Sequence, residues 1–337
     1  MIRKSGPLIC LLAAPETSPG VLYGLFDVLS TVGAVYDDMT TGVPGEELLD
    51  VKIVARSKAP FRCLGNFLIE PHADIYEIDF ADAVVVCDLY TPIDQSPTGV
   101  YDEEVAWLRK MYESNALLSS VCSGSAVLAE TGLLNGLEVS GHWAYRHMFE
   151  KFYPEVKWQE NSVLNLAYES KRLVTCGGVT SWQDLAIYLI ERLCGLEHAN
   201  KTARVHLLAK HTEGQLPFAA MTQRSQNTDA LIGDCQQWIA KHYEAANPVA
   251  TMAERTGLSP RTFARRFKVA TGYQPMEYVQ GIRMERARYL LETGSASVDD
   301  ISFEVGYEDP ASFRRVFKRK LGITPIRYRK KFSGVRG

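Results

Sequence analysis

The chain has 337 residues, of which 46% are hydrophobic and 23% are charged, and its formal net charge is −3. The length is that of two domains, and the composition excludes collagen-like, low-complexity and disordered proteins. No apolar run approaches the roughly 20 residues that a membrane span needs, and residues 1–7 lack the apolar core of a signal peptide. The seven cysteines include no Cys-x-x-Cys pair, which favours the reduced thiols of a cytosolic protein over a disulfide framework or a zinc site.

The near-neutral net charge is divided unevenly along the chain. Residues 228–337 contain 19 Lys and Arg against 12 Asp and Glu, a balance of +7, and the remaining residues have a balance of −10. A basic segment joined to an acidic one indicates a module that binds a polyanion, attached to a domain that does not.

Residues 8 to about 208 alternate short apolar runs with helical patterns. Continuous apolar runs such as residues 83–87 are typical of strands buried on both faces of a parallel sheet. The alternation predicts a doubly wound α/β domain. The predicted strands are 8–14, 51–55, 83–87, 117–121 and 173–176, and the predicted helices are 21–32, 102–113, 124–134, 142–152 and 181–193.

One segment of this α/β region carries candidate chemistry. Cys122 stands between the predicted strand 117–121 and the predicted helix 124–134, which is the arrangement of a nucleophile elbow. The N-terminus of a helix beside a thiol lowers the thiol pKa. The alternative is a buried cysteine that packs as a small apolar residue.

His142 is the candidate partner of Cys122. The alternative is that His142, beside Trp143, is a packed and hydrogen-bonded residue and not a base. We expect no metal site here, because His142 and His147 are five residues apart and do not share a helical face.

Around residues 213–228 the sequence is polar, contains Gly and Pro, and has no sustained period, which predicts a linker. The predicted organisation is a first domain at 1–212, the linker at 213–228 and a second domain at 229–337. Everything after the linker has the pattern of short helices, so the second domain is expected to be all-α.

The second domain contains an internal repeat of 50 residues. Each copy predicts a short helix, a turn and a second helix. The first copy has Gly257 in the turn and Ser259 as the N-cap before Pro260, and the second has Gly306, Asp309 and Pro310. Eight identities in 19 positions carry the repeat: Pro260 with Pro310, Phe263 with Phe313, Arg265 with Arg315, Phe267 with Phe317, Lys268 with Lys318, Gly272 with Gly322, Pro275 with Pro325 and Tyr278 with Tyr328.

The helix after each of these prolines has an apolar face and a basic face. The paired phenylalanines are expected in the core, because residues four apart share a helix face. Arginine pairs with guanine in the major groove and lysine neutralises phosphates, so the opposite face suits DNA. The alternative is the solvated face of an ordinary helical bundle, but two matching copies in the basic segment favour DNA. The predicted DNA-contacting residues are Arg261, Thr262, Ala264, Arg265 and Lys268 in the first copy and Ala311, Arg314, Arg315 and Lys318 in the second.

Residues from about 229 to 332 resemble the AraC-type DNA-binding domain. The resemblance includes residues 282–291, 298–307, 312–318 and 322–329. It implies two helix-turn-helix units held by one long helix, which contact successive major-groove segments roughly 34 Å apart. Pro310 and Ala311 offer only apolar base contacts, so the second unit is expected to be less specific.

The segments around Cys122, at 128–136 and at 140–143, together with Asp184, resemble the PfpI/ThiJ-type group of the class I glutamine amidotransferase-like superfamily over roughly residues 7–208. This resemblance implies a flavodoxin-like fold. Joined to an AraC-type domain, it resembles the GlxA-like transcriptional regulators, whose first domain senses a ligand and dimerises. Catalytic members place a His after the Cys, where this chain has Ser123, and residues 19–27 offer no Glu before Asp27.

The sequence therefore predicts a cytoplasmic transcription regulator that binds double-stranded promoter DNA. A small-molecule effector is expected near Cys122, His142, Asp27 and Asp184, although the two aspartates could equally be cap or ion-pair residues. We expect a homodimer through the first domain, no catalytic residue, no cofactor, no metal and no membrane association. The alternatives are a cysteine-dependent amidase or protease with an added DNA-binding domain, a thiol redox sensor, and a purely structural helical bundle.

Overall fold

The computed structural model describes residues 6–166, 172–220 and 229–333. The chain divides into two compact units, Met1–Gln215 and Leu216–Gly337. Of the predicted linker, residues 221–228 lie outside the described residues, and the predicted boundaries of the domains and the linker stay predictions.

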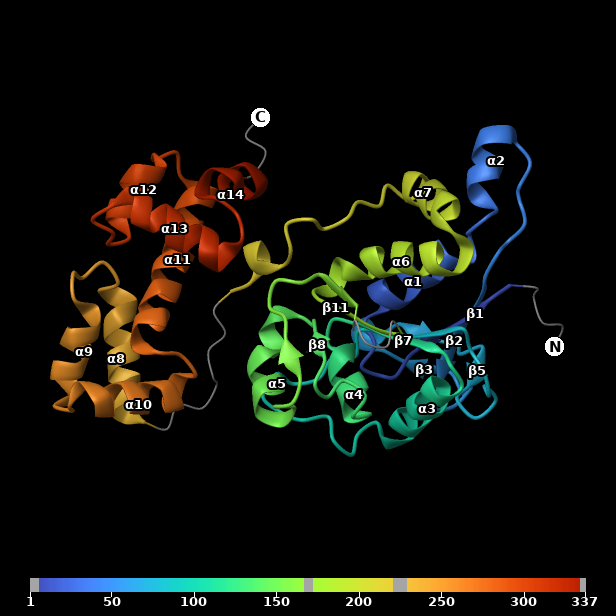
Figure 1. Ribbon diagram of the computed structural model, residues 1–337, viewed down its shortest axis with the longest axis horizontal. Helices are drawn as coiled ribbons and strands as arrows, with labels where there is room; N and C mark the ends of the chain where they lie inside the picture. The colour runs from blue at the N-terminus through green and yellow to red at the C-terminus, as the bar shows by residue number, and fades with distance from the viewer. Residues whose placement is uncertain (1–5, 167–171, 221–228, 334–337) are drawn as a thin grey trace. The chain divides into compact units, whose positions relative to one another are not determined.

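Unit 1 is built on a seven-stranded sheet in the order β10-β11-β7-β6-β1-β2-β5 (Figure 1). All neighbouring strands are parallel except the antiparallel pair β10 and β11. The central order β2-β1-β6-β7-β11 is the flavodoxin-like one, so the predicted doubly wound fold is confirmed. The strands are β1 Leu8–Leu12, β2 Asp50–Ala55, β5 Ala73–Asp74, β6 Ala83–Val86, β7 Leu117–Val121, β10 Leu164–Leu166 and β11 Leu173–Cys176.

Helices cover both faces of this sheet (Figure 1). Along β1, Ile9 and Leu11 belong to one core and Cys10 and Leu12 to the other, because side chains alternate across a strand. The first core includes the apolar faces of α1 and α6, and the second includes those of α3, α4 and α5. The helices are α1 Pro19–Ser30, α6 Trp182–Cys194 and α7 Leu196–Val205 on one side, and α3 Asp102–Glu113, α4 Gly124–Glu130 and α5 Arg146–Phe152 on the other.

Most of the helices and strands of unit 1 that the sequence pattern did not predict are short. A two-residue strand has no period to detect, and the predicted helix 124–134 ends early at Glu130, just before Gly132 with its φ of +74°. No single described helix is long and apolar enough to cross a membrane. The remaining elements of unit 1 are α2 Val35–Thr41, β3 Phe61–Arg62, β4 Leu68–Ile69, β8 Glu138–Val139, β9 Lys157–Trp158 and the 3-10 turns η1 Leu64–Asn66, η2 Trp143–Tyr145 and η3 Val179–Ser181.

The described elements of unit 2 are all helices, and the longest, α11, runs from the group of α8, α9 and α10 to the group of α12, α13 and α14 (Figure 1). Tyr278 and Val279 of α11 belong to the core of the first repeat, whereas Met284, Ala287 and Leu291 belong to that of the second. At 1.5 Å per residue α11 is about 28 Å long. The elements are η4 Leu216–Phe218, α8 Ala230–Lys241, α9 Pro248–Thr256, α10 Pro260–Thr271, α11 Pro275–Thr293, α12 Val298–Glu304, α13 Pro310–Leu321 and α14 Pro325–Phe332.

The repeat is preserved in its helix caps. The Ser259 hydroxyl accepts a hydrogen bond from the backbone N–H of Thr262, and the Asp309 carboxylate accepts from those of Ala311 and Ser312. Gly257 has a left-handed φ of +66°, which stops α9 as predicted. Both predicted N-caps are therefore confirmed.

Candidate functional site

Unit 1 has its candidate site at the carboxyl edge of β6 and β7. Cys122 directly follows β7 with a φ of +55°, a strained value for a residue with a side chain. A Cβ on Gly124 would lie 2.5 Å from the backbone oxygens of Val86 and Cys87, so only glycine fits there. The strand, the strained residue and the helix α4 have the geometry of a nucleophile elbow.

Asp88, which sequence reasoning missed, lies two residues beyond the end of β6 and holds this elbow. It is only 9% exposed, and its carboxylate accepts hydrogen bonds from the backbone N–H and the hydroxyl of Ser123. Its signal in the sequence was an acidic residue just after the predicted strand 83–87, at the sheet edge where α/β domains bind ligands. The residue that stands where catalytic relatives have His is therefore bound to a carboxylate.

The Cys122 thiol is in a poor environment for a nucleophile. Burial raises its pKa well above the ordinary value, and the negative charge of Asp88 raises it further. The expectation that the N-terminus of α4 lowers this pKa is wrong, because burial and the carboxylate outweigh that effect. The reactive form of cysteine is the thiolate, and the raised pKa favours the protonated thiol near neutral pH.

His142 begins the turn η2 and is partly buried. Its Nδ1 accepts a hydrogen bond from the backbone N–H of Ala144 at 3.2 Å, which places the proton of the neutral ring on Nε2. Burial lowers the pKa of His142, and the charge of Asp88 opposes this effect. Among the described residues no hydrogen bond joins His142 to Cys122, but the charge of Asp88 acts on both.

We call Asp88, Cys122, His142 and Tyr145 the Asp88 cluster. The His142 ring lies 4.9 Å from that of Trp143 and 6.4 Å from that of Tyr145, measured between centroids. Burial raises the pKa of Tyr145, and the negative charge of Asp88 adds to the increase. The cluster combines one buried carboxylate with aromatic rings and hydrogen-bonding groups.

The other two predicted ligand residues are placed differently. Asp27 is exposed on α1, whereas the Asp184 carboxylate lies 2.6 Å from Nδ1 of His211 and accepts a hydrogen bond from its backbone N–H. In the described part of the chain neither aspartate hydrogen-bonds to a member of the Asp88 cluster. Their predicted role in ligand binding stays a prediction, as does that of Cys122 and His142.

In the described part of the chain, no group of three or more His, Cys, Asp or Glu residues is arranged to hold a metal ion.

Unit 2 presents its candidate DNA face on α10. Arg261, Arg265 and Lys268 are exposed, while Phe263 and Phe267 are fully buried on the opposite side. Thr262 and Ala264 are partly buried between them. A surface hollow lies on this face, lined by Ala264, Arg265, Lys268, Val269 and Gln274.

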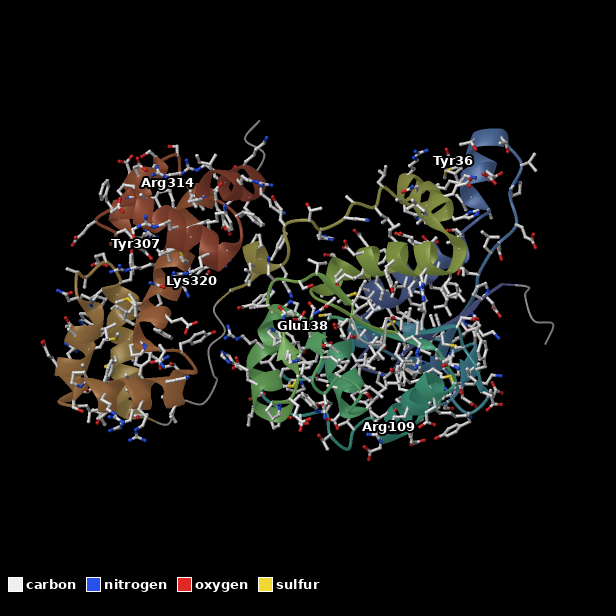
Figure 2. All side chains as sticks on the ribbon, in the orientation of Figure 1. Tyr36, Arg109, Glu138, Tyr307, Arg314 and Lys320 are labelled. Atoms are coloured by element: carbon white, nitrogen blue, oxygen red, sulfur yellow. The ribbon has the colours of Figure 1, made fainter. Side chains whose placement is uncertain are left out.

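The same face of α13 is basic but tied to acidic residues. Arg314 forms an ion pair with Asp299 of α12, and Arg315 lies 3.9 Å from the N-cap Asp309. Figure 2 shows the side chain of Arg314 at the surface of this half of unit 2. Ala311 and Lys318 are exposed beside them.

Comparison with known proteins agrees with this division of the chain. Residues 28–192 match the DJ-1/PfpI family, and residues 252–331 match a helix-turn-helix domain. The chain therefore joins a DJ-1/PfpI domain to an AraC-type helix-turn-helix domain.

Its relatives include named regulators. The chain is 28% identical over 225 residues to the HTH-type transcriptional regulator CdhR of Pseudomonas aeruginosa. This match covers 66% of this chain and 65% of CdhR, so the chain spans just under two thirds of the length of that relative. It is 26% identical over 245 residues to the HTH-type transcriptional regulator GlxA of Rhizobium meliloti, across 72% of this chain and 73% of the relative. The solved structure of Drosophila melanogaster DJ-1beta matches with a TM-score of 0.49 and 17% identity, across 61% of this chain and all of the other.

Proposed function

We propose that this protein is a sequence-specific DNA-binding transcription regulator. The observation that carries the proposal is the pair of equivalent helices α10 and α13, each capped, packed and exposed in the same way and each with a basic outer face. Two such helices joined by α11 suit two successive segments of the major groove of one DNA duplex.

Selection of duplexes from a random library by the purified full-length chain tests this proposal. A regulator enriches a defined sequence, and binding to that sequence weakens in Arg265→Ala. Enrichment of no sequence, or equal enrichment by Arg265→Ala, would contradict it. Arg204→Ala, on α7 of unit 1, is the control that removes a positive charge outside the helix-turn-helix units.

We further propose that a small-molecule effector binds at the Asp88 cluster. The supporting observations are the buried carboxylate of Asp88 and the partly buried imidazole of His142 in the same cluster. A thermal-shift screen of the full-length chain with amines, amino acids and small acids tests the proposal. An effector of this site raises the melting temperature of the wild type and of Asp38→Asn, which changes an exposed aspartate of α2, but not that of His142→Ala.

We propose that unit 1 acts as a sensor and not as an enzyme. The raised pKa of the Cys122 thiol and the engagement of Ser123 by Asp88 argue against cysteine-dependent hydrolysis. The same raised pKa argues against a peroxide-sensing thiol, because oxidation requires thiolate character. Mild peroxide that modifies Cys122 selectively and changes DNA affinity would favour the redox alternative. We also propose a cytoplasmic homodimer formed through unit 1, which sedimentation of the full-length chain tests.

A further inference from the structure

The end of unit 1 and the start of unit 2 are consecutive residues, Gln215 and Leu216, and each is anchored within its own unit. The inference from these anchors rests on the proposed function, because it concerns how the effector site is coupled to the DNA-binding domain.

Gln215 is built into unit 1 beside the Asp88 cluster. It is 4% exposed, and its side-chain amide donates hydrogen bonds to the backbone oxygens of Gly141 at 2.9 Å and Ser162 at 3.2 Å. Its side-chain oxygen accepts from the backbone N–H of Trp143 at 3.2 Å. Gln215 therefore holds the residues on both sides of His142.

The next three residues, η4, are held by α11 within unit 2. Arg288 is 6% exposed, and its guanidinium donates to the backbone oxygens of Leu216 at 3.2 Å and Pro217 at 3.4 Å. Its other amino group pairs with Glu285 at 3.1 Å. A buried guanidinium that binds two carbonyls of one turn fixes the path of that turn.

The C-terminal end of α14 also holds η4, through contacts with Phe218 of this turn. The ring of Phe218 meets that of Phe332 edge to face, with centroids 5.3 Å apart, and the Lys331 amino group lies 4.9 Å from the Phe218 ring centre. Pro217 and Phe218 also line a groove with Tyr328 and other residues of α11 and α14. The turn is therefore part of the second helix-turn-helix unit.

We propose that residues 215–218, which we call the coupling segment, transmit the state of the effector site to the second helix-turn-helix unit. An effector that moves the backbone around His142 changes the three side-chain hydrogen bonds of Gln215. Because Gln215 is bonded to Leu216, the same change acts on the contacts of η4 with Arg288 and Phe332. The coupling segment is the two-state element, docked or released, that both sites bias.

Hydrogen–deuterium exchange of the full-length chain tests this coupling without effector or DNA. Phe218→Ala removes a contact in unit 2, and we expect faster exchange at residues 141–145 of unit 1 as well as in α14. Gln215→Glu keeps the side-chain volume but places an oxygen against two carbonyls in unit 1, and we expect faster exchange in α14. An increase of about fivefold corresponds to the lower end of typical coupling between sites.

Phe303→Ala is the matched control, since Phe303 is a half-exposed phenylalanine of the same unit, 54% exposed against 47% for Phe218. Its effect should stay within unit 2. The coupling is refuted if Phe218→Ala and Gln215→Glu each change exchange only in their own unit, or if Phe303→Ala reaches residues 141–145 equally. Faster exchange in strands β1 and β6 would indicate that the whole of unit 1 is destabilised. If Phe218→Ala has this effect, the milder variant Phe218→Leu is measured and judged by the same criteria.

The outcome is separable from that of the proposed function. If the chain selects a DNA sequence but exchange shows no effect across units, the regulator stands and the coupling segment fails. If no DNA sequence is selected but exchange in one unit responds to the other, the coupling stands and the proposed function fails.

Discussion

The two helix-turn-helix units have nearly the same interior. The rings of Phe263 and Phe267 are 5.4 Å apart and inclined at 57°, and those of their repeat partners Phe313 and Phe317 are 5.6 Å apart at the same angle. In each unit the second phenylalanine meets a tyrosine from the following helix edge to face, Tyr278 or Tyr328.

The surfaces of the two helix-turn-helix units differ at two positions where only the second unit has an acidic residue. Asp299 and Asp309 of the second unit pair with Arg314 and Arg315 of α13, whereas the equivalent positions of the first unit, 249 and 259, hold Val and Ser. Among the described residues Arg261 and Arg265 of α10 form no ion pair.

A second difference concerns Arg266 of α10. Its guanidinium binds both carboxylate oxygens of Asp229, the N-cap of α8, at 2.9 and 3.0 Å, so it supports the domain instead of facing DNA. The repeat partner of Arg266 is the buried Val316. The repeat therefore preserves the core and the helix caps but not the charges. Because acidic residues lie against the arginines of α13, we predict that the stronger base contacts come from α10.

The largest expected effect tests whether the two interiors are equivalent. Phe267→Ala and Phe317→Ala each remove a fully buried ring, and each should lower the free energy of unfolding of its own unit by about 3–5 kcal/mol. Hydrogen exchange should rise in α8 to α10 for the first variant and in α12 to α14 for the second. If either variant raises hydrogen exchange equally in both helix-turn-helix units, the two interiors are not independent of each other.

The next effect separates the two arginines at the same repeat position. Arg265→Ala should weaken binding to the selected DNA sequence by about 1–3 kcal/mol if it makes a bidentate base contact. Arg315→Ala should cost less, because Arg315 already lies near Asp309. Fluorescence anisotropy with the selected and a scrambled duplex measures both, and a larger loss for Arg315→Ala would reverse our assignment.

A smaller effect concerns the exposed lysine that both units share. Lys268→Ala and Lys318→Ala should weaken binding to all DNA sequences alike and lower the slope of log affinity against log salt by about one each. Titrations of the same duplexes over a range of salt concentrations measure this slope. Loss confined to the selected sequence would show that the lysine contacts bases instead of phosphates.

The smallest effect comes from removing the acidic restraint on α13. Asp299→Asn frees Arg314 and removes a negative charge from this face, so affinity should rise, by no more than about 1 kcal/mol because the ion pair is exposed. Glu308→Gln, which removes a neighbouring exposed charge, should change affinity less. Weaker binding by Asp299→Asn would indicate that the pair orients Arg314 for DNA.

Much of the fold followed from the sequence because the determinants are local. The five predicted strands of the central sheet are found within two residues of their predicted ends, since a continuous apolar run is a local signal. The N-caps Ser259 and Asp309 were predicted for the same reason. Cys122 was placed at the elbow, but Asp88 was missed, because the two residues meet only when β6 and β7 pair.

By itself the sequence determined the doubly wound order of elements, the repeat of the second domain and the basic faces of α10 and α13. Tertiary structure alone decided how the charges are used: burial and Asp88 raise the pKa of Cys122, Asp299 binds Arg314, and Arg288 holds η4. The physical reason is that burial and electrostatic neighbours come from segments far apart in the chain. Periodicity records only which face a side chain occupies, and the partner on that face is chosen by packing.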